Sequence, residues 1–285
     1  MTEVQVAKFG HRSSSNDSAI SNLTPDTVAT EEPLEIRIRH HGLSSVGEHG
    51  NEAPTAKPVA VVMRTPGDDF DLAWGLAITE GIVGRPEDIL SAHWGEPADF
   101  NAVELRLDPT SILAEVATGS AWLVNSSCGL CGKDAIESIV QATQFLGDID
   151  MKLQASALGG FTDSLRDRQE IFSITGGLHG AGAFEADGSV VCVREDIGRH
   201  NAVDKVIGHL AKTGRLPAHD IVLAVSGRAG FEIVNKAAIA GIPVVIAVSA
   251  PSSLAVELAE RLGMTLAGFV RQAGANIYCG QGRLR

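Results

Sequence analysis

From residue 171 to the C-terminus, short apolar runs alternate regularly with stretches of helical period, and this alternation limits the possible folds most. The expected strands are IFSITGG, SVVCVRED, IVLAVSGRAG, IPVVIAVSAP and MTLAGFVR, and the expected helices are RHNAVDKVIGHLAK, FEIVNKAAIAG and SSLAVELAERLG. Strands connected through helices pair in parallel, with the helices covering the sheet. The sequence therefore predicts an α/β protein in which residues 171–285 form a largely parallel sheet.

The chain preceding this region shows a different pattern. LEIRIRH and VELRLDP alternate apolar and polar residues as half-buried strands do, and PVAVVMRT leads through a Pro-Gly turn into the amphipathic helix DFDLAWGLAITE. These elements predict a small α+β domain over residues 31–118, followed by a loop and connecting helices over 119–170. Residues 1–30 are rich in Ser, Thr, Asn and Asp, and we expect a disordered leader there.

Charge and hydropathy exclude some classes of function. The formal net charge of −12 argues against a nucleic-acid-binding protein, because such proteins present a broad basic face. No apolar segment reaches the roughly 18 to 20 residues that a membrane-spanning helix needs. The N-terminal residues lack the apolar core of a signal peptide. We expect a cytoplasmic protein without a membrane anchor.

The segment SSCGLCGK places Cys128 and Cys131 three positions apart in a glycine-containing loop. A helix is expected to begin just after Cys131, and Lys133 lies close by. Both a helix N-terminus and a nearby lysine favour the thiolate, which is the nucleophilic form of cysteine. The pair is the strongest candidate for a catalytic site.

Three interpretations of the pair are compatible with its spacing. Half of a structural zinc site would require further ligands, but no second C-x-x-C occurs and Cys192 falls in an expected buried strand. A thioredoxin-like redox pair belongs between the first strand and helix of its domain, whereas this pair lies between two domains. The third interpretation is a persulfide carrier. Spacing alone leaves all three open.

Candidate ligand-binding residues follow two of the expected strands. The turn VSGRAGFE could bring backbone amides and Arg228 to a phosphate, and His179 lies in the glycine-rich segment SITGGLHGAG at the end of another strand. Asp204 and Lys205 are expected on a solvated helix face, and the serines of SAPSSLA are expected to cap a helix. A zinc deaminase would carry H-x-E before P-C-x-x-C, and no H-x-E occurs in this chain.

Six motifs together make the chain similar to a known family, the formate dehydrogenase accessory sulfurtransferases (FdhD). The resemblance runs from Pro33 to the C-terminus. The motifs, in order, are TPGDDFDLAWGLAITEGIV, SSCGLCG, TGGLHGAGAF, REDIGRHNAVDKVIG, the run from SGRAGFEIVNK to MTLAGFVR, and NIYCG.

The resemblance implies a fold and a function. It implies a C-terminal domain with the three-layer α/β/α fold of cytidine deaminases, without their zinc ligands, and hence no metal site. It implies a sulfurtransferase in molybdenum cofactor biosynthesis, which passes persulfide sulfur from a cysteine desulfurase to the bis(molybdopterin guanine dinucleotide) molybdenum cofactor for formate dehydrogenase. A homodimer is also implied.

The resemblance assigns the persulfide to Cys128 and Cys131, with Cys128 as the expected carrier. It places the cofactor, or a guanine nucleotide in its stead, at FVRQAG. The cofactor-binding residues expected there are Phe269, Val270, Arg271, Gln272, Ala273 and Gly274, to which the strand-end argument adds Arg228 and His179. Two other functions remain compatible with the sequence: a chaperone that shields the cofactor during delivery, and a dithiol oxidoreductase with a reversible Cys128–Cys131 disulfide.

Overall fold

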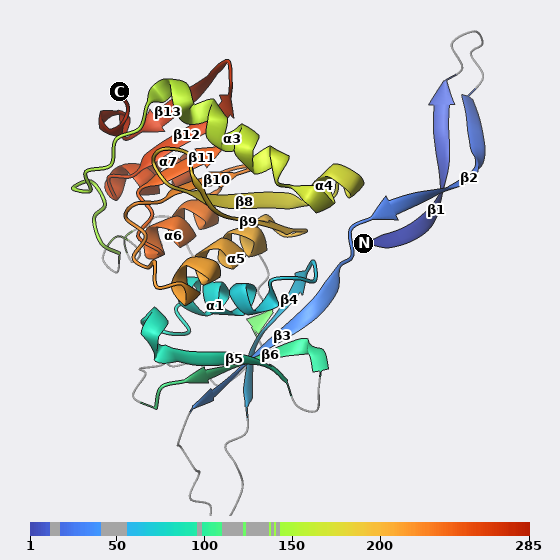
Figure 1. Ribbon diagram of the computed structural model, residues 1–285, viewed down its shortest axis with the longest axis horizontal. Helices are drawn as coiled ribbons and strands as arrows, with labels where there is room; N and C mark the ends of the chain where they lie inside the picture. The colour runs from blue at the N-terminus through green and yellow to red at the C-terminus, as the bar shows by residue number, and fades with distance from the viewer. Residues whose placement is uncertain are drawn as a thin grey trace, which may run out of the picture.

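The larger part of the molecule is built on a six-stranded sheet. The computed structural model describes residues 1–11, 18–40, 56–95, 99–109, 122–123, 137, 140 and 143–285. The sheet has the order β13-β12-β11-β10-β8-β9 (Figure 1). Its strands are β8 (His179–Phe184), β9 (Val190–Asp196), β10 (Val222–Val225), β11 (Val244–Ala247), β12 (Thr265–Arg271) and β13 (Gly274–Cys279).

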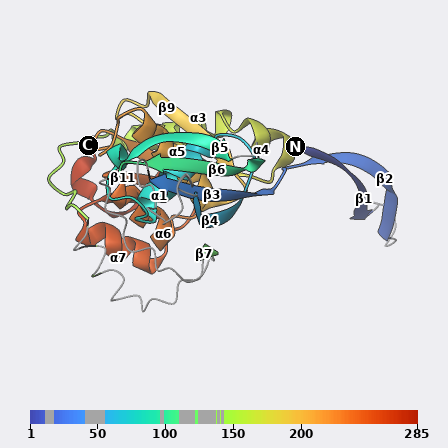
Figure 2. The same ribbon diagram turned by 90° about the horizontal axis from the view of Figure 1, so that it is seen from below.

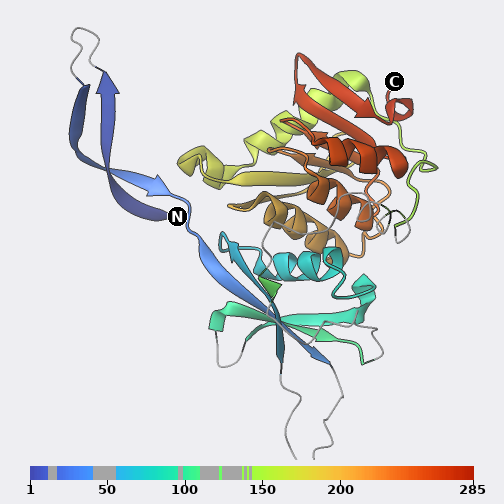
Figure 3. The ribbon, with the colours of Figure 1, turned by 180° about the vertical axis from the view of Figure 1, so that it is seen from behind.

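Helices cover both faces of this sheet. Along β10, Leu223 and Val225 pack in one apolar cluster, whereas Val222 and Ala224 pack in another, because successive strand residues point to opposite faces. The first cluster includes residues of the helices α5 (Arg199–Lys212), α6 (Phe231–Ile239) and α7 (Ser253–Arg261), and the second includes residues of α3 (Leu158–Asp167). The two sides are seen in Figures 1 and 3. The α/β class and its three layers are confirmed.

The expectation of a largely parallel sheet is wrong, because only β10–β11 and β11–β12 pair in parallel. The pairs β8–β9, β8–β10 and β12–β13 are antiparallel. The connections explain the difference. Only five residues separate β8 from β9 and two separate β12 from β13, which suits hairpins, whereas a parallel crossover needs a dozen residues or more.

A five-stranded sheet forms the smaller part, in the order β5-β6-β3-β4-β7. Its strands are β3 (Glu32–His40), β4 (Lys57–Arg64), β5 (Ile89–Gly95), β6 (Asp99–Leu107) and β7 (Trp122–Leu123), with the helix α1 (Asp69–Thr79) and the 3₁₀ turn η1 (Pro86–Asp88). Strand β7 comes from the segment after residue 118 and pairs in parallel with β4. The predicted domain limits remain predictions.

The two parts meet where α1 crosses α5, and at this crossing the backbones of the two helices are in direct contact. A Cβ atom added at Gly75 would lie 1.8 Å from the carbonyl oxygen of Asp204, and one added at Gly208 would lie 1.8 Å from that of Asp71. Only glycine fits at these two positions. The close crossing brings charged side chains of one helix against the other.

Asp204 and Lys205 are buried in this contact, so the expectation of a solvated helix face is wrong. Asp204 lies 3.0 Å from the ammonium of Lys236 and accepts a hydrogen bond from the Thr79 hydroxyl. Lys205 lies 2.8 Å from Asp196 and donates to the main-chain oxygen of Thr65. Buried charges of this kind are paired, and here polar groups of the smaller part complete the pairing.

The same contact includes a third carboxylate, Asp71 of α1. It lies 2.8 Å from the guanidinium of Arg194 on β9 and 2.8 Å from the ammonium of Lys212 on α5. Salt bridges therefore join the smaller part to both β9 and α5.

Where the structure describes them, at 1–11 and 18–30, the first thirty residues are not the unstructured leader expected from their composition. Strands β1 (Thr2–His11) and β2 (Ser18–Val28) pair antiparallel, from Thr2 opposite Val28 to His11 opposite Ser18. The β-branched residues Val4 and Val6 alternate with polar residues, a strand pattern that the polar composition obscured. The hairpin stands apart from both sheets (Figure 2).

The segment IFSITGG, expected as a strand, instead contributes to the helix α4 (Glu170–Thr175). The carboxylate of Glu195 accepts hydrogen bonds from the amides of Ile171 and Phe172, which would otherwise be unsatisfied in the first turn. Gly176 then ends the helix with a positive φ of 65°. Short 3₁₀ turns, η2 (Ala155–Ala157) and η3 (Gln281–Arg283), complete the described elements. None of the described helices offers the apolar length that a bilayer crossing needs.

Candidate functional site

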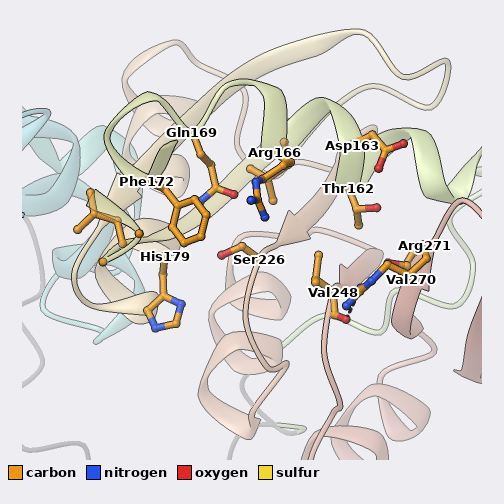
Figure 4. Close-up of a pocket in the computed structure, with 14 residues that line it drawn as sticks. Thr162, Asp163, Arg166, Gln169, Phe172, His179, Ser226, Val248, Val270 and Arg271 are labelled. Atoms are coloured by element: carbon orange, nitrogen blue, oxygen red, sulfur yellow. Dashed lines mark hydrogen bonds between the residues drawn. The ribbon is translucent and has the colours of Figure 1, made fainter. Parts of the chain in front are cut away.

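A cavity of about 440 Å³ opens where several strands of the six-stranded sheet end (Figure 4). Ser226 follows β10, Val248 follows β11, and Val270 and Arg271 end β12. Helices α3 and α4 form the opposite wall. The lining residues are Thr162, Asp163, Leu165, Arg166, Gln169, Phe172, Gly176, Gly177, Leu178, His179, Ser226, Val248, Val270 and Arg271. The carboxyl ends of strands are where open α/β sheets bind ligands.

Three of the lining residues are basic in type. Arg166 lies on α3, with its guanidinium carbon 4.7 Å from the ring centre of Phe172. Arg271 donates from Nη1 to the main-chain oxygens of Val248, at 2.6 Å, and of Val270, at 2.8 Å. His179 begins β8. Guanidinium groups on the wall of a cavity suit a ligand that carries phosphate.

Gln169 supplies a buried polar group with unused bonding capacity. Its side chain is only 3% exposed, and its Nε2 finds no hydrogen-bond partner among the described residues. A Cβ atom at Gly180 would lie 2.7 Å from that nitrogen, so a glycine makes room for the amide. A buried N–H without a partner costs free energy, which a ligand oxygen could recover.

Two further arginines lie near His179, outside the cavity lining. Burial, and after it the charges of Arg199 and Arg228, lowers the pKa of the His179 imidazole below its usual 6.5. Neither arginine forms an ion pair with a carboxylate among the described residues. Arg199 begins α5, and Arg228 lies between β10 and α6. The positive charge at this edge of the sheet therefore extends past the cavity toward the N-termini of α5 and α6.

The predicted cofactor-binding residues divide into two groups. The cavity lining includes Val270, Arg271 and His179, but not Phe269, Gln272, Ala273, Gly274 or Arg228. The side chain of Phe269 is 47% exposed, on a backbone with a φ of 54°. Gln272 donates a hydrogen bond from Nε2 to a carboxylate oxygen of Asp163. Ala273 belongs to the β12–β13 turn, after which Gly274 begins β13.

His179 begins its strand rather than ending the preceding one, which corrects the placement expected from SITGGLHGAG. It nevertheless reaches the site, because β8 is antiparallel to β10 and its first residues lie beside the end of β10. The N-terminal end of β8 therefore lies at the same edge of the sheet as the C-terminal ends of the parallel strands.

Sequence reasoning missed the α3 and α4 wall of the cavity. Asp163 and Arg166 are three residues apart on a helix, and such spacing is equally typical of a solvated face. Only the position of α3 over the ends of β10–β12 distinguishes them. The side chain of Ser252 does cap α7, accepting from the amide of Ala255 as expected.

Two of the four cysteines fall among the residues that the structure describes. Cys128 and Cys131, the predicted sulfur-carrying pair, lie outside the described residues. Cys192 is buried in β9, as expected, and Cys279 is buried at the end of β13. Burial raises the pKa of each of these two thiols to about 11. At neutral pH both are protonated and poorly nucleophilic.

Comparisons with known proteins identify the family. Residues 30–285 match the FdhD/NarQ family. A protein named "Sulfur carrier protein FdhD" from Streptomyces avermitilis is 42% identical over 276 residues, covering 94% of this chain and 92% of its own. A protein of the same name from Saccharolobus solfataricus is 38% identical over 254 residues, covering 89% of each chain.

A solved structure has the same fold. It is the crystal structure of a putative formate dehydrogenase accessory protein from Desulfotalea psychrophila, with a TM-score of 0.71 and 20% identity over 99% of each chain. The family match covers the residues of both the five-stranded and the six-stranded sheet. The solved structure superposes on nearly the whole chain, both sheets included. The chain belongs to the FdhD/NarQ family.

Proposed function

We propose that this protein is a sulfur carrier that takes sulfane sulfur from a cysteine desulfurase and delivers it to the bis(molybdopterin guanine dinucleotide) molybdenum cofactor. In this proposal the product serves formate dehydrogenase, and the cofactor is bound as a substrate in the cavity beside Arg271. The observation that carries the proposal is the combination of this cavity with the SSCGLCG segment in a chain 42% identical to a named sulfur carrier.

The cysteines support the assignment of the carrier by elimination. A persulfide forms when a thiolate attacks the outer sulfur of the donor's persulfide and the donor thiolate leaves. Cys192 and Cys279 are buried, and with pKa values near 11 they rarely form thiolates. Cys128 and Cys131 remain, each followed directly by a glycine and with Lys133 nearby. Elimination does not choose between these two, and we assign the persulfide to Cys128 because the family resemblance implies it.

Release of the sulfur requires the second cysteine. Attack of the Cys131 thiolate on the inner sulfur of the Cys128 persulfide forms a Cys128–Cys131 disulfide and expels hydrosulfide after uptake of a proton. The hydrosulfide sulfur replaces an oxygen ligand of the cofactor metal, and the oxygen takes the hydrosulfide proton and one further proton from solvent and leaves as water. A cellular dithiol then reduces the disulfide and restores both thiols.

The cavity supports the cofactor part of the proposal through its chemistry. A guanine dinucleotide carries phosphates, which Arg166 and Arg271 can bind as charged hydrogen-bond donors. Leu165, Val248 and Val270 give the apolar surface that a planar ring system requires. His179 and the unpaired amide of Gln169 add polar groups at the other end.

Mass spectrometry after incubation with a cysteine desulfurase and isotopically labelled cysteine tests the proposal. We expect one labelled sulfur on the peptide that contains Cys128, removable by a mild reductant. The peptides containing Cys192 and Cys279 serve as internal controls and should stay unlabelled. A labelled Cys131 with an unlabelled Cys128 would reverse their roles. No label on either, with guanine nucleotide still bound, would favour a cofactor-delivery chaperone.

Cellular complementation tests the same chemistry independently. In cells lacking this protein, Cys128→Ala should fail to restore formate dehydrogenase activity, whereas the wild-type chain should restore it. Restoration by Cys128→Ala would contradict the carrier mechanism. A readily reversible Cys128–Cys131 disulfide with turnover on thiol substrates would instead indicate a dithiol oxidoreductase.

A further inference from the structure

Charge is distributed unevenly along the cavity. Asp163 is the one carboxylate among the residues that line it, whereas Arg166, Arg271 and His179 are basic. Asp163 and Thr162 lie with Arg271 at one end, and Phe172 and His179 lie at the other (Figure 4). A cavity that bound only phosphate would gain nothing from a carboxylate, because like charges repel. Asp163 therefore indicates a hydrogen-bond donor on the ligand at that end.

The carboxylate of Asp163 is held in place from outside the cavity. Gln272 donates from Nε2 to its Oδ2, so the β12–β13 turn orients the side chain. Helix α3 approaches this turn closely, since a Cβ atom at Gly159 would lie 2.8 Å from the Cα of Gln272. Thr162, the preceding residue, is buried and donates to the carbonyl of Gly159. Helix and turn are thus packed together, and a hydrogen bond from the turn orients the solvent-exposed carboxylate of Asp163.

Asp163 keeps unused acceptor capacity. It forms no ion pair with Arg166 or Arg271 among the described residues, although both arginines line the same cavity. A carboxylate accepts only, and its two oxygens offer about four lone pairs, of which Gln272 uses one. A ligand with two adjacent donors would match the remaining capacity.

Guanine has that pair of donors. Its Watson–Crick edge presents the N1–H and the 2-amino group side by side, and a carboxylate can accept from both. Adenine presents an acceptor at N1 beside its 6-amino donor, so a carboxylate faces a lone pair there. The apolar side chains of Leu165, Val248 and Val270 line the same cavity, and apolar surface of this kind suits the plane of a base.

We infer that the carboxylate of Asp163 selects guanine as the base of the nucleotide bound in this cavity, as a specificity-determining contact. The inference rests on the proposed function, because it takes the cavity to be the cofactor site. The phosphates of the same ligand would then run from Arg271 past Arg166 toward His179, in the direction of Arg228 and Arg199.

Nucleotide binding to the full-length chain tests the inference, with GDP, IDP and ADP as the probes and calorimetry as the measurement. The wild-type protein should bind GDP most tightly, IDP less tightly because it lacks the 2-amino group, and ADP least. Asp163→Asn should weaken GDP binding about ten- to a hundredfold. This is the loss of affinity expected when hydrogen bonds to a charged group are removed. ADP binding should be unchanged or tighter, since an amide can pair with adenine. Asp163→Ala should lose the preference for GDP without gaining affinity for ADP.

Asp167→Asn is the matched control. It makes the same change one turn further along α3, at an exposed residue that does not line the cavity, so its affinities should equal those of the wild type. An unchanged GDP-to-ADP ratio in Asp163→Asn would overturn the inference while leaving the proposed function intact. Equal binding of GDP and ADP by the wild type would do the same. Failure of all three nucleotides to bind would overturn both the inference and the cavity as the cofactor site.

Discussion

The ammonium group of Lys205 lies 2.8 Å from a carboxylate oxygen of Asp196, and both side chains are buried. Lys205 also donates to the main-chain oxygens of Thr65 and Glu195, and the amide of Thr65 donates to Asp196. The pair thus holds the turn after β4 against β9 and α5. Its arrangement determines what happens when one charge is removed.

Replacing Lys205 by methionine should lower the free energy of unfolding by about 3 to 5 kcal/mol, because the Asp196 carboxylate would stay buried without its counter-charge. The double variant Lys205→Met, Asp196→Asn should recover part of the loss. Urea denaturation measures both. Lys152→Met, at a partly exposed lysine that pairs with Asp150, should change the free energy by less than about 0.5 kcal/mol. If the double variant lost as much free energy of unfolding as the two single variants together, this account would be contradicted.

Gly75→Ala should separate α1 from α5, because the new methyl group would lie 1.8 Å from the Asp204 carbonyl oxygen. We expect a loss of at least about 1 to 3 kcal/mol, the usual cost of overpacking. Gly160→Ala is the control on α3, where no atom lies within 4 Å of the added Cβ. It should stabilise by about 0.5 to 1 kcal/mol, since alanine favours helix over glycine. Thermal unfolding of both variants would show whether their effects have opposite signs.

The His179 imidazole should respond to an anion in the cavity. Its pKa lies below 6.5 in the free protein, so it is neutral at pH 7. A bound phosphate favours the protonated ring and raises this pKa, so binding takes up a proton. GDP affinity should therefore rise as the pH falls from 8 toward the His179 pKa, by less than about tenfold per pH unit.

His209 provides the control for this titration. Burial and Arg194 lower its pKa too, but it does not line the cavity. NMR titration should show the His179 resonance shifting on addition of GDP and the His209 resonance unchanged. His179→Gln should remove most of the pH dependence. Equal shifts of both histidines would indicate a global change rather than a contact.

Arg271→Glu should weaken GDP binding by about tenfold or more, because a carboxylate would replace a charged donor on the cavity wall. Persulfide formation on the Cys128 peptide should be unaffected. Arg285→Glu makes the same change of charge at the exposed C-terminal residue, outside the cavity lining, and should bind GDP normally. Equal loss of GDP binding and of persulfide formation in Arg271→Glu would point to misfolding.

The sequence predicted the elements with long, clear periodicity. Helix α5 covers Arg199–Lys212, the whole of RHNAVDKVIGHLAK, because its apolar stripe and length leave no alternative. The segment IFSITGG is helical where its pattern predicts a strand, since seven residues of mixed pattern do not separate helix from strand. Its helix depends on Glu195, which is distant in sequence and caps the first turn.

Burial of charge could not be predicted from local pattern either. Asp204 and Lys205 have the spacing of a solvated helix face, and only the crossing of α1 explains why both are withdrawn from solvent. Of the residues expected at the cofactor site, His179, Val270 and Arg271 line the strand side of the cavity. Its helical wall was missed because the position of α3 over the strand ends depends on tertiary packing.

The crossing of α1 and α5 also has a consequence for how such a chain could evolve. Arg194 and Lys212 of the larger part pair with the carboxylate of Asp71 in the smaller part, so each part carries charges that the other neutralises. Recombination that replaced the five-stranded sheet and α1 by an unrelated module would take the Asp71 carboxylate away from these two cations. We therefore expect such an exchange to be tolerated only where the new module supplies a carboxylate at the same place, so the surface of each part limits variation in the other.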